Sequence, residues 1–467
     1  MKMWAGRFRE PLEPAFERWQ RSFPFDQRLL PEELAASRAY ARALEQAGAL
    51  SGEETKTILG GLEQIGKKAA QEPAWVAASD AEDVHHFVEL RLIELVGDLG
   101  GKLHTGRSRN EQIATDLRLY VRKQISETRA RLADLIEAFV ARAGELGGTA
   151  MPAYTHLQRA EPVLAAHWLL AYAEMFFRDA ERLADCEKRV NLLPLGSGAV
   201  AGAPLALDRQ GMARALGFAR VSANSLDATS DRDFALEFLH GLGFVALHLS
   251  RWAEEMALFA SSEYGFVRLP DRYATGSSAM PQKKNPDAME LLRGKTGRVL
   301  GAATALSVML KGLPLAYNKD LQESQEPLFD AADTVLGSLE MAAGFLRAIE
   351  FDRERMPAAA MSGFLNATAA AGYLAARGVP FRQAHAAVGQ AVVYCLEKGK
   401  TLEALTLDEL RKFRPEFEKD FYEAVKLEAA LAAHDVEGGT APARVERALA
   451  AARERVAALR KEADANA

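Results

Sequence analysis

The sequence has 467 residues, 49% of them hydrophobic, so the chain can bury a large core and is expected to form two or three structural units. Its formal net charge of −6 argues against nucleic acid as the main partner, because phosphate binding normally shows as a basic excess. The opening "MKMWAGRFREPLEP" lacks the apolar core of a signal peptide, and charges interrupt the longest apolar stretches before they could span a bilayer. We therefore expect a cytoplasmic protein that acts on a small molecule, without a membrane partner.

Helical periodicity dominates the sequence, and period-two alternation is nearly absent. From Glu111 to Leu146 there is no proline, and apolar residues recur at helical spacing until the Gly147-Gly148 pair. This pattern predicts a helix of about 35 residues, roughly 50 Å long at 1.5 Å per residue. Three of the next four predicted helices begin at a proline, which suits the first helical position. The four helices are predicted at residues 162–193, 231–261, 286–311 and 327–349.

These five helices are apolar around much of their circumference, which exceeds what the core of one subunit needs. The pattern predicts a bundle that is buried in an oligomer. We expect an all-α fold with three units: an amino-terminal helical domain (1–110), a central long-helix bundle (111–355) and a carboxy-terminal helical domain (356–467).

Distinctive polar stretches fall at the ends of the long helices, where loops are exposed and adaptable and can carry function. They are "LHTGRSRNEQ", "AYTHLQRAEP", "LGSGAVAGAP", "TGSSAMPQKKNP" and "YNKDLQESQEP". The third stretch lacks the preceding strand and the following Lys-Ser/Thr of a phosphate loop, so we interpret its glycines as backbone that permits close packing.

The stretch "ATGSSAMPQKKNPDAMELLRGK" contains more polar chemistry than a turn requires: Ser277, Ser278, Lys283, Lys284 and Asn285. Its Asn-Pro pair is expected to start a helix, whose N-terminal dipole and free N–H groups favour an anion. The lysines add positive charge, so the stretch indicates a carboxylate or phosphate site. The alternative is a Gly/Pro turn with solvated lysines.

The stretch "AYTHLQRAEP" places Thr155, His156 and Gln158 directly before a predicted helix. A single histidine at such a place is most often a surface or capping residue. It gains catalytic value if a carboxylate orients it, and Glu290 is a candidate one turn into the helix after Lys283.

The stretch "HTGRSRNEQ" combines Arg107, Arg109 and Asn110 with two hydroxyl residues. Arginine binds carboxylates through a bidentate fork, so a pair of arginines at a helix start indicates a dianion. Alternatively, at least one of them makes structural salt bridges.

Metal and disulfide chemistry have little support in the sequence. Cys186 and Cys395 lie far apart and are interpreted as buried small hydrophobic residues. His85 and His86 follow an acidic run, but no second cluster of comparable density supplies the remaining ligands of a metal. We expect neither a metal nor a cofactor, and a substrate with several carboxylates; the residues alone do not name the bond that breaks.

The chain resembles the argininosuccinate lyase family of the fumarase/aspartase superfamily over nearly its whole length. "GSSAMPQKKNPD" is similar to the superfamily signature in the form typical of these lyases. "HTGRSRN", "YTHLQRA", "LPLGSGA", "SDRDF" and "AYNKDLQE" occur in the expected order, and "WAGRF" fits the family opening. The resemblance implies an all-α homotetramer with a shared central bundle, in which three subunits build each active site. It also implies reversible cleavage of argininosuccinate to L-arginine and fumarate, the last step of arginine biosynthesis.

The resemblance also implies the roles of individual residues. Ser277 would remove the proton next to a carboxylate, which requires that the helix end and nearby N–H groups stabilise its alkoxide. Lys283 and Asn285 would stabilise the resulting aci-carboxylate, and His156, held by Glu290, would be the acid or its relay. The catalytic set is Ser277, His156, Lys283, Glu290, Thr155 and Asn285. The substrate-binding set is Ser22, Arg109, Asn110, Thr155, Tyr317, Gln322 and Gln325.

Two positions depart from the family pattern. Gln325 stands where the family usually has lysine, and Glu111 stands where it usually has aspartate. The loss of the lysine charge puts one contact to a substrate carboxylate in doubt, although an amide can still donate a hydrogen bond.

Other readings are related lyases and a structural protein. Adenylosuccinate lyase, fumarase and aspartase share the serine loop, but "HTGRSRN" and "AYNKDLQE" favour argininosuccinate. Some relatives serve as lens crystallins, but a scaffold has no need of Ser277, His156, Lys283 and Glu290 together.

Overall fold

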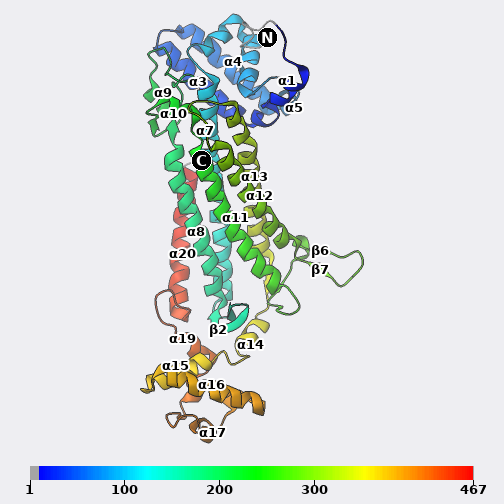
Figure 1. The fold of residues 1–467 in the computed structure, drawn as a ribbon, viewed down its shortest axis with the longest axis vertical. Coiled ribbons are helices and arrows are strands. Elements are labelled where there is room, and N and C mark those ends of the chain that lie inside the picture. Colours follow the sequence, from blue (N-terminus) through cyan, green and yellow to red (C-terminus); the bar gives the residue numbers. More distant parts are fainter. Residues whose placement is uncertain (1–9, 466–467) are drawn as a thin grey trace.

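Long helices run along one axis of the computed structural model, which describes residues 10–465 (Figure 1). A helical unit built from the described residues that precede α7 caps one end, and a small helical unit caps the other. The all-α fold class is therefore confirmed. The long helices are α7 (Arg109–Leu146), α8 (Ala165–Val190), α11 (Asp233–Phe259), α12 (Asp287–Leu310), α13 (Gln325–Ala348) and α20 (Pro442–Ala465).

The start and end of α7 follow from local chemistry. Ser108 and Glu111 form a capping box, in which the Ser108 N–H donates to Glu111 Oε1 at 3.1 Å and the Asn110 N–H donates to Ser108 Oγ at 3.2 Å. Gly147 ends the helix with a φ of 50°, a region that glycine enters without a Cβ penalty. The helix was expected from 111 to 146, so its prediction is confirmed to within two residues.

The predicted start of α8 is wrong. Pro162 lies in strand β2 (Gln158–Leu164), which pairs antiparallel with β1 (Ala150–Thr155), and the helix begins only at Ala165. The other two prolines are also displaced from the first helical position: Pro286 precedes α12, and Pro327 is the third residue of α13. The N–H that proline lacks is equally dispensable at these positions, because the first turn of a helix has no intrahelical acceptors for its N–H groups.

The amino-terminal unit packs around α3 (Leu30–Gln46), α4 (Gly52–Gln71) and α6 (Val84–Val96). Its apolar residues join the core of the bundle without a break. Its smaller helices are α1 (Pro14–Gln20), α2 (Phe23–Asp26), η2 (Gln27–Leu29), α5 (Pro73–Ala77) and η3 (Gly97–His104).

The carboxy-terminal unit has a hydrophobic core of its own, made by residues between Ala370 and Val425. Helix α20 then returns along the bundle and packs against α7 and α8 (Figure 1), so its side chains belong to the bundle core. The stretch expected as one domain, 356–467, thus contributes to two cores. The helices of this stretch before α20 are α14 (Arg355–Ala360), α15 (Ala367–Ala376), α16 (Phe381–Lys398), η6 (Leu402–Ala404), α17 (Leu407–Arg411), α18 (Phe421–Ala424) and α19 (Leu427–Ala432).

Short elements connect the long helices. They are β3 (Leu192–Leu193), α9 (Arg209–Ala215), β4 (Arg220–Val221), α10 (Ser225–Ser230), β5 (Val267–Arg268), η4 (Asp271–Tyr273), β6 (Thr275–Gly276), β7 (Lys284–Asn285), η5 (Lys319–Ser324) and β8 (Glu350–Phe351). Within residues 10–465, no helix is both long enough and apolar enough to cross a membrane. Cys186 and Cys395 are both buried and free, as expected.

Candidate active site

The structure places the predicted site residues in three separate regions of one chain. One group lies where the amino-terminal unit meets the bundle, a second lies on the β1–β2 hairpin, and a third lies on the β6–β7 loop, which projects from the side of the bundle (Figure 1). Arg109 begins α7 and the hairpin follows its end. The 38 residues of α7, roughly 57 Å long at 1.5 Å per residue, therefore separate Arg109 from the start of the hairpin that carries His156.

The first region encloses a cavity of about 130 Å³. Six of the seven residues predicted to bind substrate line it, all except Thr155. The lining residues are Ser22, Asp26, Glu82, Asp83, His85, Arg109, Asn110, Ile113, Tyr317, Lys319, Gln322 and Gln325. Segments that are about 300 positions apart in the sequence thus meet at one polar site.

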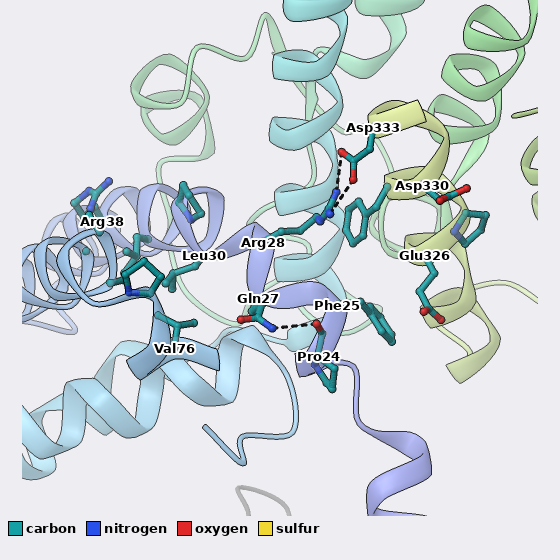
Figure 2. Close-up of a pocket in the computed structure, with 18 residues that line it drawn as sticks. Pro24, Phe25, Gln27, Arg28, Leu30, Arg38, Val76, Glu326, Asp330 and Asp333 are labelled. Carbon is teal, nitrogen blue, oxygen red and sulfur yellow. Dashed lines mark hydrogen bonds and ion pairs between the residues drawn. The ribbon is translucent and has the colours of Figure 1, made fainter. Parts of the chain in front are cut away.

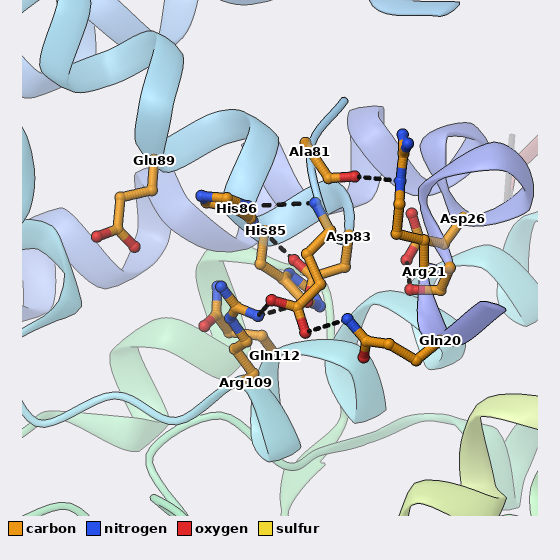
Figure 3. A network of polar contacts seen from close by, with 12 residues as sticks. Gln20, Arg21, Asp26, Ala81, Asp83, His85, His86, Glu89, Arg109 and Gln112 are labelled. Atoms are coloured by element: carbon orange, nitrogen blue, oxygen red, sulfur yellow. Dashed lines mark hydrogen bonds and ion pairs between the residues drawn. The ribbon is translucent and has the colours of Figure 1, made fainter. Parts of the chain in front are cut away.

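Ion pairs and hydrogen bonds organise this cavity (Figure 3). Ser22 Oγ donates to Asp26 Oδ2 at 2.6 Å. Arg109 Nη1 donates to Asp83 Oδ2 at 2.8 Å and lies 3.4 Å from a Glu82 oxygen. Arg109 therefore faces the cavity with a carboxylate partner already in place. A bound anion would share this arginine with Asp83.

Two buried oxygen atoms at the cavity lack hydrogen-bond partners among the described residues. They are Asp26 Oδ1 and Gln325 Oε1, on side chains that are 1% and 3% exposed. Unpaired buried acceptors are costly, so Gln325 Oε1 favours a ligand or water with an N–H or O–H donor, whereas Asp26 Oδ1 can itself donate when the carboxyl is protonated. Burial, with the charge of Asp83, raises the pKa of Asp26 to about 7. Gln325, which replaces the usual lysine, presents an acceptor that a lysine could not offer.

A larger cavity, about 1230 Å³, lies on the other side of α2 between α3, α4 and α13 (Figure 2). Arg28 pairs there with Asp333 at 3.1 Å and stacks 4.6 Å from the centre of the Phe329 ring. The described lining includes none of the predicted site residues. We therefore place the candidate site at the smaller cavity, which six of the seven predicted substrate-binding residues line.

Ser277 lies in the β6–β7 loop and accepts two backbone hydrogen bonds. The N–H groups of Ala279 and Met280 point at its Oγ from 3.3 and 3.1 Å. Thr275 anchors the start of the loop, since its N–H and its Oγ1 donate to Asp287 Oδ2 at 3.2 and 2.5 Å. The loop thus has the N–H donors that an alkoxide at Ser277 would require.

The two lysines of this loop differ in their partners. Lys284 Nζ forms an ion pair with Asp271 at 2.5 Å and also donates to the Leu269 carbonyl. Lys283 is exposed and has no ion pair among the residues described. Lys283 is therefore the lysine of this pair without an ion pair among the described residues, and its role toward a substrate stays a prediction.

His156 occupies a strained turn at the tip of the β1–β2 hairpin. Its φ is 54° and that of Leu157 is 57°, so two residues that have a Cβ fill the left-handed positions of a two-residue loop. Both side chains are exposed. A single chain does not bring His156 to Glu290, which is also exposed and lies 3.8 Å from Arg293 on its own helix. Their pairing stays a prediction that only an assembly of chains could satisfy.

Glu111 and Arg107 have structural roles. Glu111 is fully buried, and its Oε2 accepts the Gly196 N–H at 2.5 Å, which ties the "LGSGAVAGAP" loop to the start of α7. Gly196 has a φ of 94°, and a Cβ there would lie 2.7 Å from Arg209 Cγ, so the close-packing interpretation of this loop is confirmed. Arg107 donates to Ser37 Oγ at 2.8 Å within the core.

Sequence reasoning missed several residues of the cavity, namely Asp26, Glu82, Asp83 and Lys319. The spacing of Ser22 and Asp26 on one helical turn was an available signal. It also missed the partners of His85, which are Glu33 and Asp116, because they lie 52 and 31 positions away on other helices.

Comparisons of the sequence with known families give a consistent result. The model of a lyase family matches residues 6–301, and the model of the argininosuccinate lyase C-terminal region matches residues 364–432. The argininosuccinate lyase of Acidobacterium capsulatum is 59% identical over 464 residues, which cover 98% of this chain and 96% of that protein. The argininosuccinate lyase of Koribacter versatilis is 58% identical, with 98% of each chain covered.

Several solved structures share the fold of this chain. EDDS lyase in complex with formate matches with a TM-score of 0.86 at 26% identity, over 98% of this chain and 93% of that chain. The class II fumarase of Schistosoma mansoni matches with a TM-score of 0.72 at 17% identity, over 86% and 90% of the two chains. The second likeness concerns the fold alone.

Proposed function

The chain belongs to the argininosuccinate lyase family, and from this premise we propose that it cleaves argininosuccinate reversibly to L-arginine and fumarate. The reaction breaks a carbon–nitrogen bond by elimination and is the last step of arginine biosynthesis, which we assign to the cytoplasm. One observation carries the mechanism: two backbone N–H groups converge on the Oγ of Ser277.

We propose that Ser277 acts as an alkoxide and removes the proton next to a substrate carboxylate. A hydrogen bond to a charged group contributes about 1.5–3 kcal/mol, so the N–H groups of Ala279 and Met280 together stabilise the alkoxide by about 3–6 kcal/mol. Electron density then moves into the carboxylate to give the doubly negative aci-carboxylate. Lys283 and Asn285 stabilise this dianion, because both lie on the same loop as the base.

Collapse of the aci-carboxylate expels the nitrogen of the arginine half. The leaving nitrogen takes a proton either from His156 directly or from another group to which His156 relays the proton. Thr155 lies next to His156 in the sequence, and Glu290 orients the imidazole ring. The arginine half and its carboxylate occupy the cavity around Ser22, Arg109, Asn110, Tyr317, Gln322 and Gln325. The steps as written use side chains and backbone only.

We further propose that the active protein is a homotetramer in which three subunits build each site. The length of α7 supports this, because its roughly 57 Å lie between Arg109 at its start and the hairpin of His156 beyond its end. Exposed apolar side chains on the long helices support it too, since such surfaces mark interfaces. They include Phe244 and Leu247 on α11, and Leu291, Leu300 and Val308 on α12.

A spectrophotometric assay of fumarate formation tests the proposed function. The purified protein should release fumarate from argininosuccinate, with much lower kcat/KM for adenylosuccinate, malate and aspartate. A higher kcat/KM for one of these three would reassign the chain within the superfamily. Absence of turnover with every substrate would favour the structural, crystallin-like reading.

A further inference from the structure

A buried polar cluster lies directly beneath the substrate cavity, where α3, α6 and α7 meet. Its members are Glu33, His85 and Asp116, which are all at most 5% exposed. His85 Nδ1 lies 2.8 Å from Glu33 Oε2 and 3.7 Å from Asp116 Oδ2. Three ionisable groups are thus held together in the core.

The imidazole of His85 connects this cluster with the cavity. On the core side, its Nδ1 contacts the Glu33 carboxylate. The ring itself lines the cavity beside Asp83 and Arg109 (Figure 3). No described residue makes a hydrogen bond to Nε2. Nε2 is therefore the nitrogen of His85 that remains for a bound molecule.

The surroundings of Glu33 favour a charged imidazole. Burial opposes charge on both partners, but the pKa of Glu33 falls to about 2 because His85, Arg107 and Ser37 stabilise its carboxylate. Burial likewise opposes charge on His85, yet Glu33 raises the His85 pKa above its ordinary value. Burial and the Glu33 charge raise the pKa of Asp116 well above its usual range, which disfavours its charged form. The charged or titratable groups around His85 are Glu33 on α3, Asp26 on α2, Asp116 and Arg109 on α7, His104 on η3, and Asp83 and Arg107 in loops.

The distances in this cluster suit a proton shared in a hydrogen bond better than they suit a bound metal ion. Ligands of a tetrahedral zinc with bonds of about 2.1 Å lie about 3.4 Å from each other, whereas His85 Nδ1 and Glu33 Oε2 are at hydrogen-bond distance, 2.8 Å. Glu33 already accepts from Ser37 Oγ at 2.6 Å and from Gln112 Nε2 at 3.1 Å. Arg107 adds a positive charge 3.8 Å from Glu33.

We propose that His85, held by Glu33 as an imidazolium, donates a hydrogen bond from Nε2 to a carboxylate of the substrate in the cavity. The proposal rests on the proposed function and adds a substrate-contacting residue to its binding set. It explains why a histidine faces a cavity that already has two cations, Arg109 and Lys319. Arg109 already donates to Asp83. His85 adds a second hydrogen-bond donor, and its contact with Glu33 in the core fixes the position of its ring.

Two substitutions distinguish the proposed hydrogen bond of Nε2 to the substrate from the buried contact of Nδ1 with Glu33. His85→Asn keeps an amide nitrogen near the position of Nδ1, so it retains a donor to Glu33 and loses the donor to the cavity. His85→Gln places its amide nitrogen near Nε2 and does the reverse. His86→Asn is the matched control, because His86 is the neighbouring residue on α6 and does not line the described cavity.

The test measures steady-state kinetics with argininosuccinate, together with calorimetric binding of arginine and of fumarate to each intact variant. His85→Asn should raise KM at least tenfold with kcat within about threefold. His85→Gln should raise KM by less than tenfold, because it keeps a donor near Nε2 but loses the charge and the Glu33 contact. His86→Asn should stay within threefold of the unsubstituted protein in both. Weaker binding of arginine alone would identify the arginine carboxylate as the acceptor, and weaker binding of fumarate a carboxylate of the succinate half.

The proposal is overturned if His85→Asn leaves KM and both binding affinities unchanged. It is also overturned if the purified protein carries about one equivalent of a divalent metal that His85→Asn loses. Should His85→Asn fail to fold, a loss of affinity below tenfold in His85→Gln supports the proposal and a larger loss contradicts it. Failure of the unsubstituted protein to cleave argininosuccinate would refute the function, while the binding measurements would still judge His85.

Discussion

The backbone N–H of Met280 donates to Ser277 Oγ at 3.1 Å, three residues along the same loop. A second N–H, from Ala279, reaches the same oxygen at 3.3 Å. Donors fixed in the backbone need no reorganisation when charge develops on the oxygen, which is the requirement for a serine to act as a base.

Ser277→Ala should lower kcat by about 10²- to 10⁴-fold, the usual contribution of a general base. Binding of argininosuccinate should survive, since the hydroxyl is needed for proton abstraction more than for affinity. Single-turnover kinetics and calorimetry measure the two quantities. Ser278→Ala is the matched control and should keep most of the activity. Near-normal turnover of Ser277→Ala would remove the serine from the mechanism.

Lys283→Ala and Lys284→Ala should differ although the residues are adjacent. Lys283 has no ion pair among the described residues, and we propose that it stabilises the dianion, so its loss should reduce kcat by about 10²- to 10³-fold. Lys284 is bound to Asp271 and the Leu269 carbonyl, so its loss should mainly loosen the loop. Both variants are compared by kcat and KM. A change confined to the KM of Lys283→Ala would make this lysine a binding residue only.

Asp26 should make stability depend on pH. Burial raises its pKa from 3.8 to about 7 in the folded chain, so between these values the unfolded chain ionises while the folded chain holds its proton. The contribution of Asp26 to the free energy of unfolding is therefore largest below pH 4. It declines as the pH rises to 7 and does not change further above pH 7. The loss is a few kcal/mol at most, at about 1.36 kcal/mol per pKa unit.

The Asp26→Asn variant isolates this contribution because every other group titrates in both proteins. Between pH 4 and pH 8, the Tm of the unsubstituted protein should fall relative to that of the variant. Calorimetric scans across this range provide the comparison. A constant difference in Tm would show that Asp26 ionises normally in the folded chain.

Much of the fold could be predicted from the sequence because long helices repeat one physical signal over many turns. For α7 and α11, the observed ends differ from the predicted ends by at most two residues. The β1–β2 hairpin was missed for two reasons: its strands contain prolines, and its turn is made by His156 and Leu157 instead of the usual Gly or Asn. The return of α20 to the bundle depends on contacts between residues more than 300 positions apart, which periodicity does not encode.

The candidate site, too, could be predicted from the sequence only in part. Family motifs identified Ser22, Arg109 and Gln325, which the structure brings to one cavity. The motifs did not reveal that Glu33 supports His85, because the two residues lie on different helices and their contact arises only when α3 packs against α6. Nor could they give the separation of Arg109 from His156, which the length of α7 sets.

The most direct test of the central claim, a lyase site assembled from several subunits, is complementation between inactive chains. His156→Asn and Ser277→Ala chains are purified separately, unfolded, mixed and refolded, and fumarate release from argininosuccinate is measured in samples shown to contain mixed tetramers. If the hairpin and the serine loop of one site come from different chains, as proposed, some mixed sites contain only intact loops, and part of the activity should return. Complete absence of activity in verified mixed tetramers would mean that one chain supplies both loops, which would contradict the proposed assembly.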